Sequence, residues 1–503
     1  MTSPAEIPYK SLVQINRDAN MPVYRQIADQ LIAAIQRGHL VAGLKLPGTR
    51  AFSQLLTVHR NTIVAVYEEL EVQGWVKTLP NKGTVVLPGM QQRPVKILPH
   101  QQAAVTAHPA AISPIAAARY PGATGYTFRQ TNILDNPFEY SDCEYVFNDG
   151  MPDTRLLQID NLSQWYSANL KRKSNQKKLA GYNQDGSEYF KANLCNYLNL
   201  SRGLHISGKN LLITRSTEMS VYITSRILLS EGDLVLVGEL SYFSMNMIFQ
   251  KNGAHIQTIP VDNEGIDVDS VQQICEHQQV RMIYITPHHH YPTTVTLSAQ
   301  RRMRLLQLAA QYGFVILEDD YDYDFHYNKA PMLPLLSADT AGMVVYTGSF
   351  GKSLAPGFRT GFIVAPENLM TEMRKYLGII DRQGDILMEQ ALGQMIQEGE
   401  IHRYLRKSMK VYQERRDNFA ALLQQHLPED VDFTIPSGGL AFWLRWKKRP
   451  NLLQLSKRCA QNNLFIPKTL LYQTQSMAAM RVGFGHLTPE EMNTCIQIIR
   501  QHL

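Results

Sequence analysis

The sequence predicts an α/β protein made of two unlike parts, a small helical module at the N-terminus and a large body built on a mostly parallel sheet. Beyond residue 205, short apolar runs recur between helical stretches, which is typical of a parallel sheet that helices cover on both faces. The first hundred residues show helical periodicity instead and carry most of the net charge of +6. A chain of 503 residues also predicts about three domains, at roughly 150 residues each.

The N-terminal module is predicted to be a helix-turn-helix followed by a hairpin. Residues 22–38 begin with proline, carry apolar side chains at helical spacing and end at glycine, as an amphipathic helix does. Apolar positions in 52–56 predict a second short helix, and the connector 57–62 leads into a third. Residues 74–86 alternate apolar and polar side chains around a Pro-Asn-Lys-Gly turn, which predicts a β-hairpin, the wing of a winged helix.

The basic charge of this module suggests a polyanion as partner, because residues 1–100 hold 11 Lys and Arg against 6 Asp and Glu. The module resembles the winged helix of the GntR family over residues 8–88, through Leu46-Pro-Gly-Thr-Arg50, His59-Arg-Asn-Thr62 and Lys82-Gly-Thr84. This resemblance implies binding to double-stranded DNA, with the start of the third helix in the major groove. The DNA-binding residues so predicted are Arg50, Arg60, Asn61, Thr62, Lys82 and Gly83. The alternative is a winged helix used for protein contact, in which Arg50 and Arg60 form surface ion pairs.

Residues 89–140 are predicted to be a flexible linker. They are rich in Gln, Ala, Pro and His, show no sustained periodicity, and cannot bury enough apolar surface to order themselves. We therefore expect a DNA-binding domain at 8–88, a linker at 89–140 and a body at 141–503, with a small C-terminal α+β part from about residue 366.

The chemically suggestive residues of the body follow the predicted strands, at the edge of the sheet where ligands of such folds bind. Lys352 follows the apolar run 343–346, and its amine can hold an aldehyde as an imine, a Schiff base. Asp319, after the run 314–317, can keep a pyridine nitrogen protonated by charge attraction. With an arginine seven residues after the lysine, this spacing predicts a site for pyridoxal 5′-phosphate. The predicted cofactor-binding residues are Ser216, Thr217, Tyr242, Tyr291, Asp319, Tyr321, Ser349, Lys352 and Arg359.

The predicted roles follow from the chemistry of each side chain. Ser216, Thr217, Ser349 and Arg359 would bind the phosphate, Tyr321 the phenolic oxygen of the ring, and Tyr242 would stack on the ring. The alternatives are that Lys352 is a surface cation, that Asp319 caps a helix or binds a metal ion, and that Tyr242 fills core space.

The whole chain resembles the MocR family of bacterial regulators, in which a GntR-type winged helix precedes a fold type I aminotransferase-like domain. The resemblance is carried by Ala180-Gly-Tyr-Asn-Gln-Asp-Gly186, Leu200-Ser-Arg-Gly203, Ile283-Tyr-Ile-Thr-Pro287, Glu318-Asp-Asp-Tyr-Asp-Tyr-Asp-Phe325 and Gly348-Ser-Phe-Gly-Lys-Ser-Leu-Ala-Pro356. It implies a homodimer that binds paired DNA half-sites, and a body that senses a small molecule instead of turning one over. It also implies that Arg481 pairs with the carboxylate of an amino acid effector, with a structural ion pair as the alternative.

The chain departs from the MocR pattern at several positions of the predicted pocket. The usual Ser-Gly-Ser-Gln phosphate turn reads Arg215-Ser-Thr-Glu218, and Gly351 replaces a serine before the lysine. The usual Ser-His-Gln-Phe-Pro-Thr-Gly reads His288-His-His-Tyr-Pro-Thr-Thr294. Adjacent side chains of an extended segment alternate, so only two of these histidines could share a metal ion. We predict a pocket wall that includes Tyr291, and no metal site.

These observations predict a DNA-binding transcriptional regulator that senses pyridoxal phosphate, or an amine or amino acid, through an internal aldimine at Lys352. The alternatives are an active pyridoxal phosphate-dependent aminotransferase and a DNA-binding protein whose body has lost the coenzyme. No stretch approaches the roughly 18 apolar residues of a membrane span, and the five scattered cysteines suggest no disulfide framework, so a cytoplasmic protein is expected.

Overall fold

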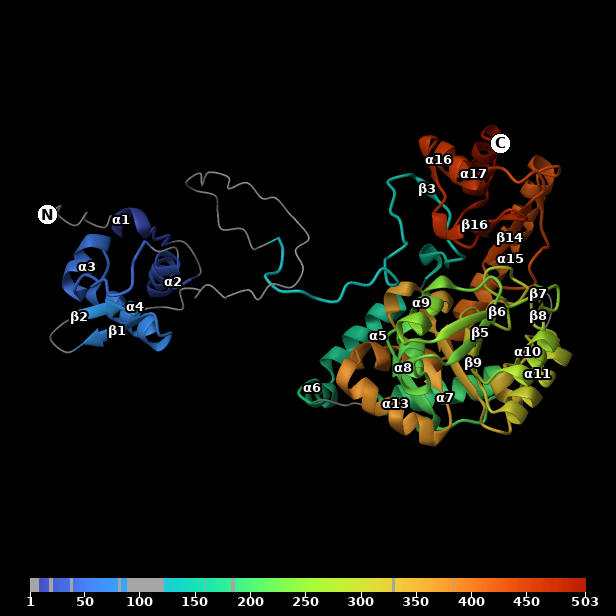
Figure 1. Ribbon diagram of the computed structural model, residues 1–503, viewed down its shortest axis with the longest axis horizontal. Coiled ribbons are helices and arrows are strands. Elements are labelled where there is room, and N and C mark those ends of the chain that lie inside the picture. Colours follow the sequence, from blue (N-terminus) through green and yellow to red (C-terminus); the bar gives the residue numbers. More distant parts are fainter. Residues whose placement is uncertain are drawn as a thin grey trace. The chain divides into compact units, whose positions relative to one another are not determined.

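The structure is a computed structural model that describes residues 9–17, 21–36, 39–79, 83–87, 122–157, 159–181, 186–327, 331–382 and 384–503. The chain divides into two compact units, Met1–Thr124 and Gly125–Leu503 (Figure 1). Among the described residues, no helix combines the length and the apolar character that a membrane crossing needs.

The first unit is a winged helix-turn-helix, as predicted. It contains α1 (Tyr9–Leu12), α2 (Val23–Gln36), α3 (Thr49–Leu56), α4 (Arg60–Val72) and an antiparallel hairpin of β1 (Val76–Leu79) and β2 (Gly83–Val86). The helices and the hairpin share one core, in which Ile27, Phe52 and Ile63 are fully buried. α4 begins earlier than the connector 57–62 suggests, because the His59 ring accepts a hydrogen bond from the Asn61 N–H at 3.3 Å and caps the helix.

The second unit is built on a seven-stranded sheet in the order β4-β12-β11-β10-β9-β5-β6. Its strands are β4 (Leu211–Thr214), β5 (Leu234–Gly238), β6 (His255–Ile259), β9 (Val280–Ile285), β10 (Val315–Asp320), β11 (Val344–Ser349) and β12 (Gly361–Val364). All run parallel except β12, which is antiparallel to both of its neighbours. The apolar runs 314–317 and 343–346 correspond to β10 and β11, and the prediction of a mostly parallel sheet is confirmed.

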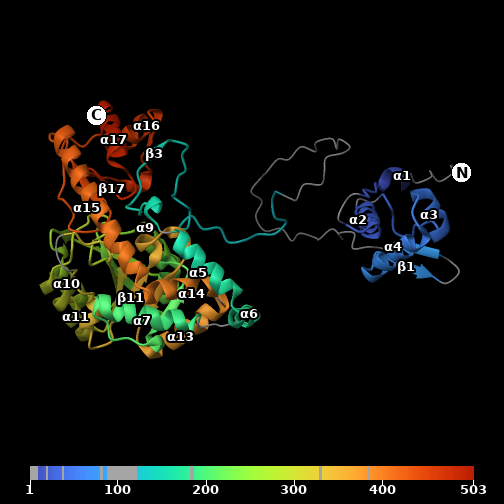
Figure 2. The same cartoon turned by 180° about the vertical axis from the view of Figure 1, so that it is seen from behind.

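Helices cover both faces of this sheet (Figures 1 and 2). The helices on one face are α8 (Thr217–Leu228), α9 (Phe243–Lys251) and α13 (Glu367–Ile380). The other face is covered by α7 (Glu188–Arg202), α10 (Val268–His277), α11 (Ala299–Tyr312) and α14 (Ile386–Gln397). Leu211 and Leu212 pack in opposite cores, because the side chains of a strand alternate between the two faces.

The small C-terminal part contains a four-stranded antiparallel sheet and helices. Its elements are α15 (Glu400–His426), β13 (Val431–Asp432), β14 (Ala441–Trp446), α16 (Leu452–Gln461), β16 (Leu471–Gln473), β17 (Ala478–Gly483) and α17 (Pro489–Gln501). The sequence places its start at about residue 366, but α13 and α14 belong to the cores of the large sheet. The boundary lies within α15, since Ile401 packs in a large-sheet core and Phe419 in the small core.

Shorter elements complete the second unit. α5 (Ile159–Lys171) and α6 (Lys173–Leu179) precede α7, β7 (Val261–Asp262) pairs with β8 (Gly265–Ile266), and β3 (Tyr145–Val146) pairs in parallel with β15 (Leu464–Phe465). Residues 89–121 of the predicted linker lie outside the described residues. Further along, the Phe138 ring lies 5.7 Å from the Phe243 ring, and Glu139 pairs with Lys468 at 2.6 Å. This end of the predicted linker therefore contacts the body.

Candidate functional site

A pocket lies where the parallel strands of the large sheet end. Most of the residues that line it lie at or just after the ends of β4, β5, β9, β10 and β11, or just before the antiparallel β12. These ends meet at one edge of the sheet. All nine residues predicted to bind the coenzyme line this pocket, namely Ser216, Thr217, Tyr242, Tyr291, Asp319, Tyr321, Ser349, Lys352 and Arg359. The fold thus brings together side chains that are far apart in the sequence.

Lys352 lies on the short helix α12 (Phe350–Ser353), directly after β11. Its side chain is 13% exposed, and its Nζ donates to Asp149 Oδ1 at 3.1 Å and to the Gly150 carbonyl at 3.0 Å. The same nitrogen lies 5.8 Å from the centre of the Tyr321 ring. A largely buried amine in a pocket excludes the alternative that Lys352 is an ordinary surface cation.

Asp319 is a buried carboxylate near the end of β10. Its Oδ2 accepts a hydrogen bond from the Tyr284 hydroxyl at 2.8 Å, whereas its Oδ1 has no hydrogen-bond partner among the described residues. Burial raises the pKa of Asp319 to about 8, against the lowering effect of the Tyr284 bond. Because an unpaired buried oxygen is costly, this carboxylate fits a cationic N–H partner such as a protonated pyridine nitrogen.

The alternatives for Asp319 find no support in the structure. Asp319 lies inside a strand, so it caps no helix. Within the described ranges, no group of three or more His, Cys, Asp or Glu side chains could hold a metal ion.

The N-terminus of α8 forms one end of the pocket. Ser216 is its N-cap residue, with a hydroxyl oxygen that accepts a hydrogen bond from the Met219 N–H at 3.2 Å, and Thr217 is its first residue. Ser349 precedes α12 without a side-chain bond to it. Arg359 stands just before β12 with φ 49° and forms no ion pair with a described residue. A helix N-terminus with hydroxyls and a cation beside it suits a phosphate group.

Two of the positions that depart from the MocR pattern line this end as well. Arg215 is directed to Asp381, with its Nε 2.6 Å from Oδ2, and Glu218 is an exposed residue of the first turn of α8. Neither removes the hydroxyls of Ser216 and Thr217 from the pocket.

Tyrosines form the aromatic wall of the pocket. The rings of Tyr242 and Tyr291 meet edge to face with centroids 4.9 Å apart. The Tyr321 hydroxyl donates to the His289 carbonyl at 2.8 Å and accepts a hydrogen bond from Arg481 at 3.2 Å. The single hydroxyl proton of Tyr321 is therefore in use, and its predicted bond to a phenolic oxygen would require that proton to be redirected.

Arg481 lies in β17, is only 1% exposed and is not among the residues that line the pocket. Besides its bond to Tyr321, it donates from Nε to the Asp149 carbonyl and from Nη1 to the Pro292 carbonyl, both at 3.0 Å. Its guanidinium carbon lies 4.6 Å from the centre of the Tyr291 ring. The pairing of Arg481 with an effector carboxylate stays a prediction, since its hydrogen bonds go to three neutral oxygens of the protein.

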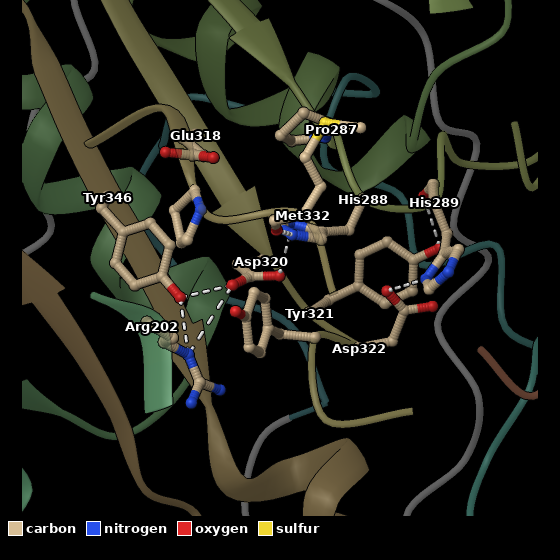
Figure 3. A network of polar contacts seen from close by, with 12 residues as sticks. Arg202, Pro287, His288, His289, Glu318, Asp320, Tyr321, Asp322, Met332 and Tyr346 are labelled. Carbon is tan, nitrogen blue, oxygen red and sulfur yellow. Dashed lines mark hydrogen bonds and ion pairs between the residues drawn. The ribbon is translucent and has the colours of Figure 1, made fainter. Parts of the chain in front are cut away.

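The three adjacent histidines are buried and do not line the pocket. His288 pairs with Asp320 at 3.3 Å and His289 with Asp322 at 2.9 Å (Figure 3), while the His290 ring lies 2.8 Å from the Thr293 hydroxyl oxygen. The predicted pocket wall at this segment therefore consists of Tyr291 without the histidines.

A buried ion network holds the helix that carries Lys352. Arg202 pairs with Asp324 at 3.1 Å, and the Ser353 hydroxyl donates to the second oxygen of the same carboxylate. Arg202 also donates to the Tyr346 hydroxyl at 2.9 Å (Figure 3). Because Ser353 follows Lys352, this network fixes the lysine-bearing turn against the end of β10.

The predicted DNA-binding residues of the first unit lie on three of its elements. Arg60, Asn61 and Thr62 open α4, and the first two are exposed. Arg50 is exposed on α3, and Gly83 opens β2 with φ 90°. Arg50 and Arg60 form no ion pair with any residue described, so the structure gives no support to the ion-pair alternative. Lys82 lies outside the described residues.

Among the pocket residues missing from the sequence prediction are two that make polar side-chain contacts there, Asp149 and Tyr284. Asp149 lies 203 residues before Lys352, in a loop that no local pattern marks as functional. Tyr284 belongs to an apolar strand, and a hydroxyl among buried apolar side chains is the signal that could have identified it.

Comparison with known proteins agrees with this two-part architecture. Residues 152–499 match the family model of aminotransferase class I and II, and residues 23–86 match that of bacterial regulatory proteins, gntR family. A probable rhizopine catabolism regulatory protein MocR from Rhizobium meliloti is 28% identical over 87% of this chain and 84% of its own length. Aromatic-amino-acid aminotransferase 1 from Thermococcus litoralis is 27% identical over 58% of this chain and 72% of its own.

A solved structure extends the similarity to the fold. The crystal structure of an archaeal alanine:glyoxylate aminotransferase superposes with a TM-score of 0.66 and 25% identity, over 71% of this chain and 90% of that one. The aminotransferase match covers more than half of the chain, and the gntR match coincides with the winged helix. The chain therefore belongs to the aminotransferase class I and II family and, with its gntR-family domain in front, has the architecture of a MocR-type regulator.

Proposed function

We propose that the protein is a transcription regulator that binds double-stranded DNA through its winged helix and pyridoxal 5′-phosphate through its aminotransferase-like domain. The gntR-family match supports the first activity. The pocket supports the second, because its residues offer partners for the ring nitrogen, the aldehyde and the phosphate of the coenzyme. The relative from Rhizobium meliloti is itself named as a regulatory protein.

The start of α4 is the part of the winged helix that we propose for DNA reading. Arg60 and Asn61 are exposed there, and a recognition helix brings its first side chains to base edges and phosphates. Arg50, Lys82 and Gly83 are proposed to contact the DNA backbone, which positions the helix without reading sequence.

The coenzyme proposal rests on one observation, the unpaired carboxylate oxygen of Asp319 in the same pocket as the largely buried amine of Lys352. Asp319 would pair with the ring nitrogen, Lys352 would hold the aldehyde, and the N-terminus of α8 with Ser349 and Arg359 would bind the phosphate. The coenzyme supplies an electron-withdrawing ring and an aldehyde that binds amines reversibly. Tyr242 would cover the ring face.

In this proposal the sensed molecule is the coenzyme itself, or an amine or amino acid that joins it. A ligand can change DNA binding only if it prefers one of two conformations of the protein. We also propose a homodimer that presents two winged helices to paired half-sites. Helix-turn-helix proteins that act as dimers bind two half-sites, and this is the arrangement proposed for the chain. Sedimentation of the purified chain should give twice the monomer mass.

The first experiment is an absorbance titration with pyridoxal phosphate. The wild type should develop the visible band of the lysine-linked coenzyme, Lys352→Ala should not, and Lys375→Ala, a change at an exposed lysine, should behave as the wild type. The second is a DNA-binding titration on the region upstream of the protein's own gene, with and without coenzyme. A missing band refutes the coenzyme site, and unchanged DNA affinity and bending refute the switch.

The second candidate is an active aminotransferase, which the relative from Thermococcus litoralis favours by its name. It predicts exchange of amino groups between an amino acid and a keto acid at enzymatic rates. A coenzyme-loaded protein that binds DNA but shows no such exchange would decide for the regulator.

A further inference from the structure

Asp149 and Gly150 form a cradle of three oxygens around the Lys352 ammonium. Nζ lies 3.1 Å from Asp149 Oδ1, 3.0 Å from the Gly150 carbonyl and 3.5 Å from the Asp149 carbonyl. An ammonium group has three N–H donors and no acceptor, so the cradle matches it in number as well as in charge. We call Asp149 and Gly150 the ammonium cradle.

The cradle is held in place by the surrounding turn. Asn148 Oδ1 accepts hydrogen bonds from the Gly150 and Met151 N–H groups, both at 2.9 Å. Gly150 has φ 99°, a conformation that glycine adopts without strain and that directs its carbonyl to the lysine. Across the turn, a Cβ on Gly483 would lie 2.3 Å from Asn148 Oδ1, so the small domain packs directly against this loop.

Charge further suits the cradle to a cation. Burial by itself would raise the pKa of Asp149, but the positive charges of Lys352 and Arg481 lower it below its ordinary value. The carboxylate is therefore ionised near neutral pH. Arg481 also fixes the Asp149 carbonyl by donating to it from Nε at 3.0 Å.

Lys352 cannot occupy the cradle as an ammonium and hold an aldehyde at the same time. When a primary amine replaces it on the aldehyde carbon, a new C=N bond forms and the C=N bond to Lys352 breaks. The incoming amine enters as its ammonium, and Nζ receives the three hydrogens that it gives up and becomes an ammonium in turn. The structure shows where such a free ammonium lies.

We propose that Asp149 is a positioning residue that receives the Lys352 ammonium when an amine effector displaces it, and thereby sets the exchange equilibrium between lysine-linked and effector-linked coenzyme. The inference rests on the proposed coenzyme site and adds a role for a pocket residue that is not itself proposed to contact the coenzyme. The cradle stabilises the displaced lysine, so it favours effector binding and opposes coenzyme capture by the lysine. One substitution should therefore move the two equilibria in opposite directions.

The test compares the full-length wild type with Asp149→Asn, which keeps the size and removes the charge. Coenzyme affinity is measured by absorbance titration without amine. Displacement is measured by adding propylamine to coenzyme-loaded protein, reducing with borohydride, and counting by mass spectrometry how much coenzyme stays on the Lys352 peptide. Loss of a charge-assisted hydrogen bond should raise the propylamine concentration at half displacement about tenfold, and should tighten coenzyme binding by a similar factor.

Two further variants control the interpretation. Asp149→Glu keeps the charge and should recover part of the displacement, whereas Glu264→Gln, at a residue 65% exposed and away from the pocket, should match the wild type. If Asp149→Asn weakens coenzyme binding and displacement together, or changes neither, the proposal is overturned. In another outcome, 1,3-diaminopropane displaces Lys352 at a lower concentration than propylamine in the wild type but not in Asp149→Asn. The cradle then holds an effector's second ammonium, and the proposal is again wrong. If the wild type itself takes up no coenzyme, the proposed function fails first.

Discussion

Replacing Asp319 with asparagine should stabilise the coenzyme-free protein while weakening its hold on pyridoxal phosphate. Burial raises the pKa of this carboxyl to about 8, from about 3.8 in an unfolded chain. The folded protein therefore binds more protons than the unfolded chain between these two values, and its free energy of unfolding falls as pH rises through this window. The gap of about four pH units corresponds to about 6 kcal/mol above pH 8, at 1.36 kcal/mol per unit.

The asparagine variant removes the titrating group and keeps the acceptor for Tyr284. Urea unfolding of the coenzyme-free proteins at pH 6 and pH 8 measures the effect. Between these values the wild type should lose about 2 kcal/mol more than Asp319→Asn, because the two pH units lie inside the window and end at its upper limit, the pKa of the folded state. An absorbance titration should show weaker coenzyme binding by the variant, which lacks the charge that pairs with the ring nitrogen.

Parallel pH dependence in the two proteins would refute this reasoning, because it would mean that Asp319 is already ionised in the folded state or has a partner there. A variant that is less stable at both pH values would assign the carboxylate a structural role instead.

Three more predictions concern other parts of the chain. Arg359→Ala should raise the Kd for pyridoxal phosphate about tenfold or more in an absorbance titration, because a charged hydrogen-bond donor to the phosphate is lost, and an unchanged Kd would place the phosphate elsewhere. Arg60→Ala should weaken DNA binding in an anisotropy titration, and should lower the slope of log affinity against log salt concentration by about 1 if Arg60 contacts a phosphate. Unchanged affinity would contradict the proposal that the start of α4 reads the DNA. Gly438→Ala should lower the free energy of unfolding in urea by about 3 kcal/mol, because the added Cβ would lie 2.2 Å from the Phe325 carbonyl oxygen. An unchanged urea midpoint would show that the backbone moves to make room for the Cβ.

The pocket residues were predictable where chemistry and local pattern coincide. Lys352 and Asp319 each follow an apolar run, so their place at the ligand-binding edge follows from the properties of parallel sheets. Asp149 carries the same kind of charge but lies in a loop 203 residues from the lysine that it contacts. No periodicity links two such positions, since only the chain's path through the small domain brings them together.

Local sequence by itself determined the two-part architecture, the strands and helices, and the identity of the groups at the strand ends, because these follow from periodicity, turn residues and side-chain chemistry. Tertiary packing alone decided the burial, the charge and the hydrogen bonding of those groups. Asp319 is buried with one oxygen unpaired, the Tyr321 hydroxyl donates its hydrogen to the His289 carbonyl, and Arg481 lies outside the pocket lining. The physical reason is that burial and long-range partners set the charge and hydrogen bonding of a side chain, and both depend on residues distant in sequence.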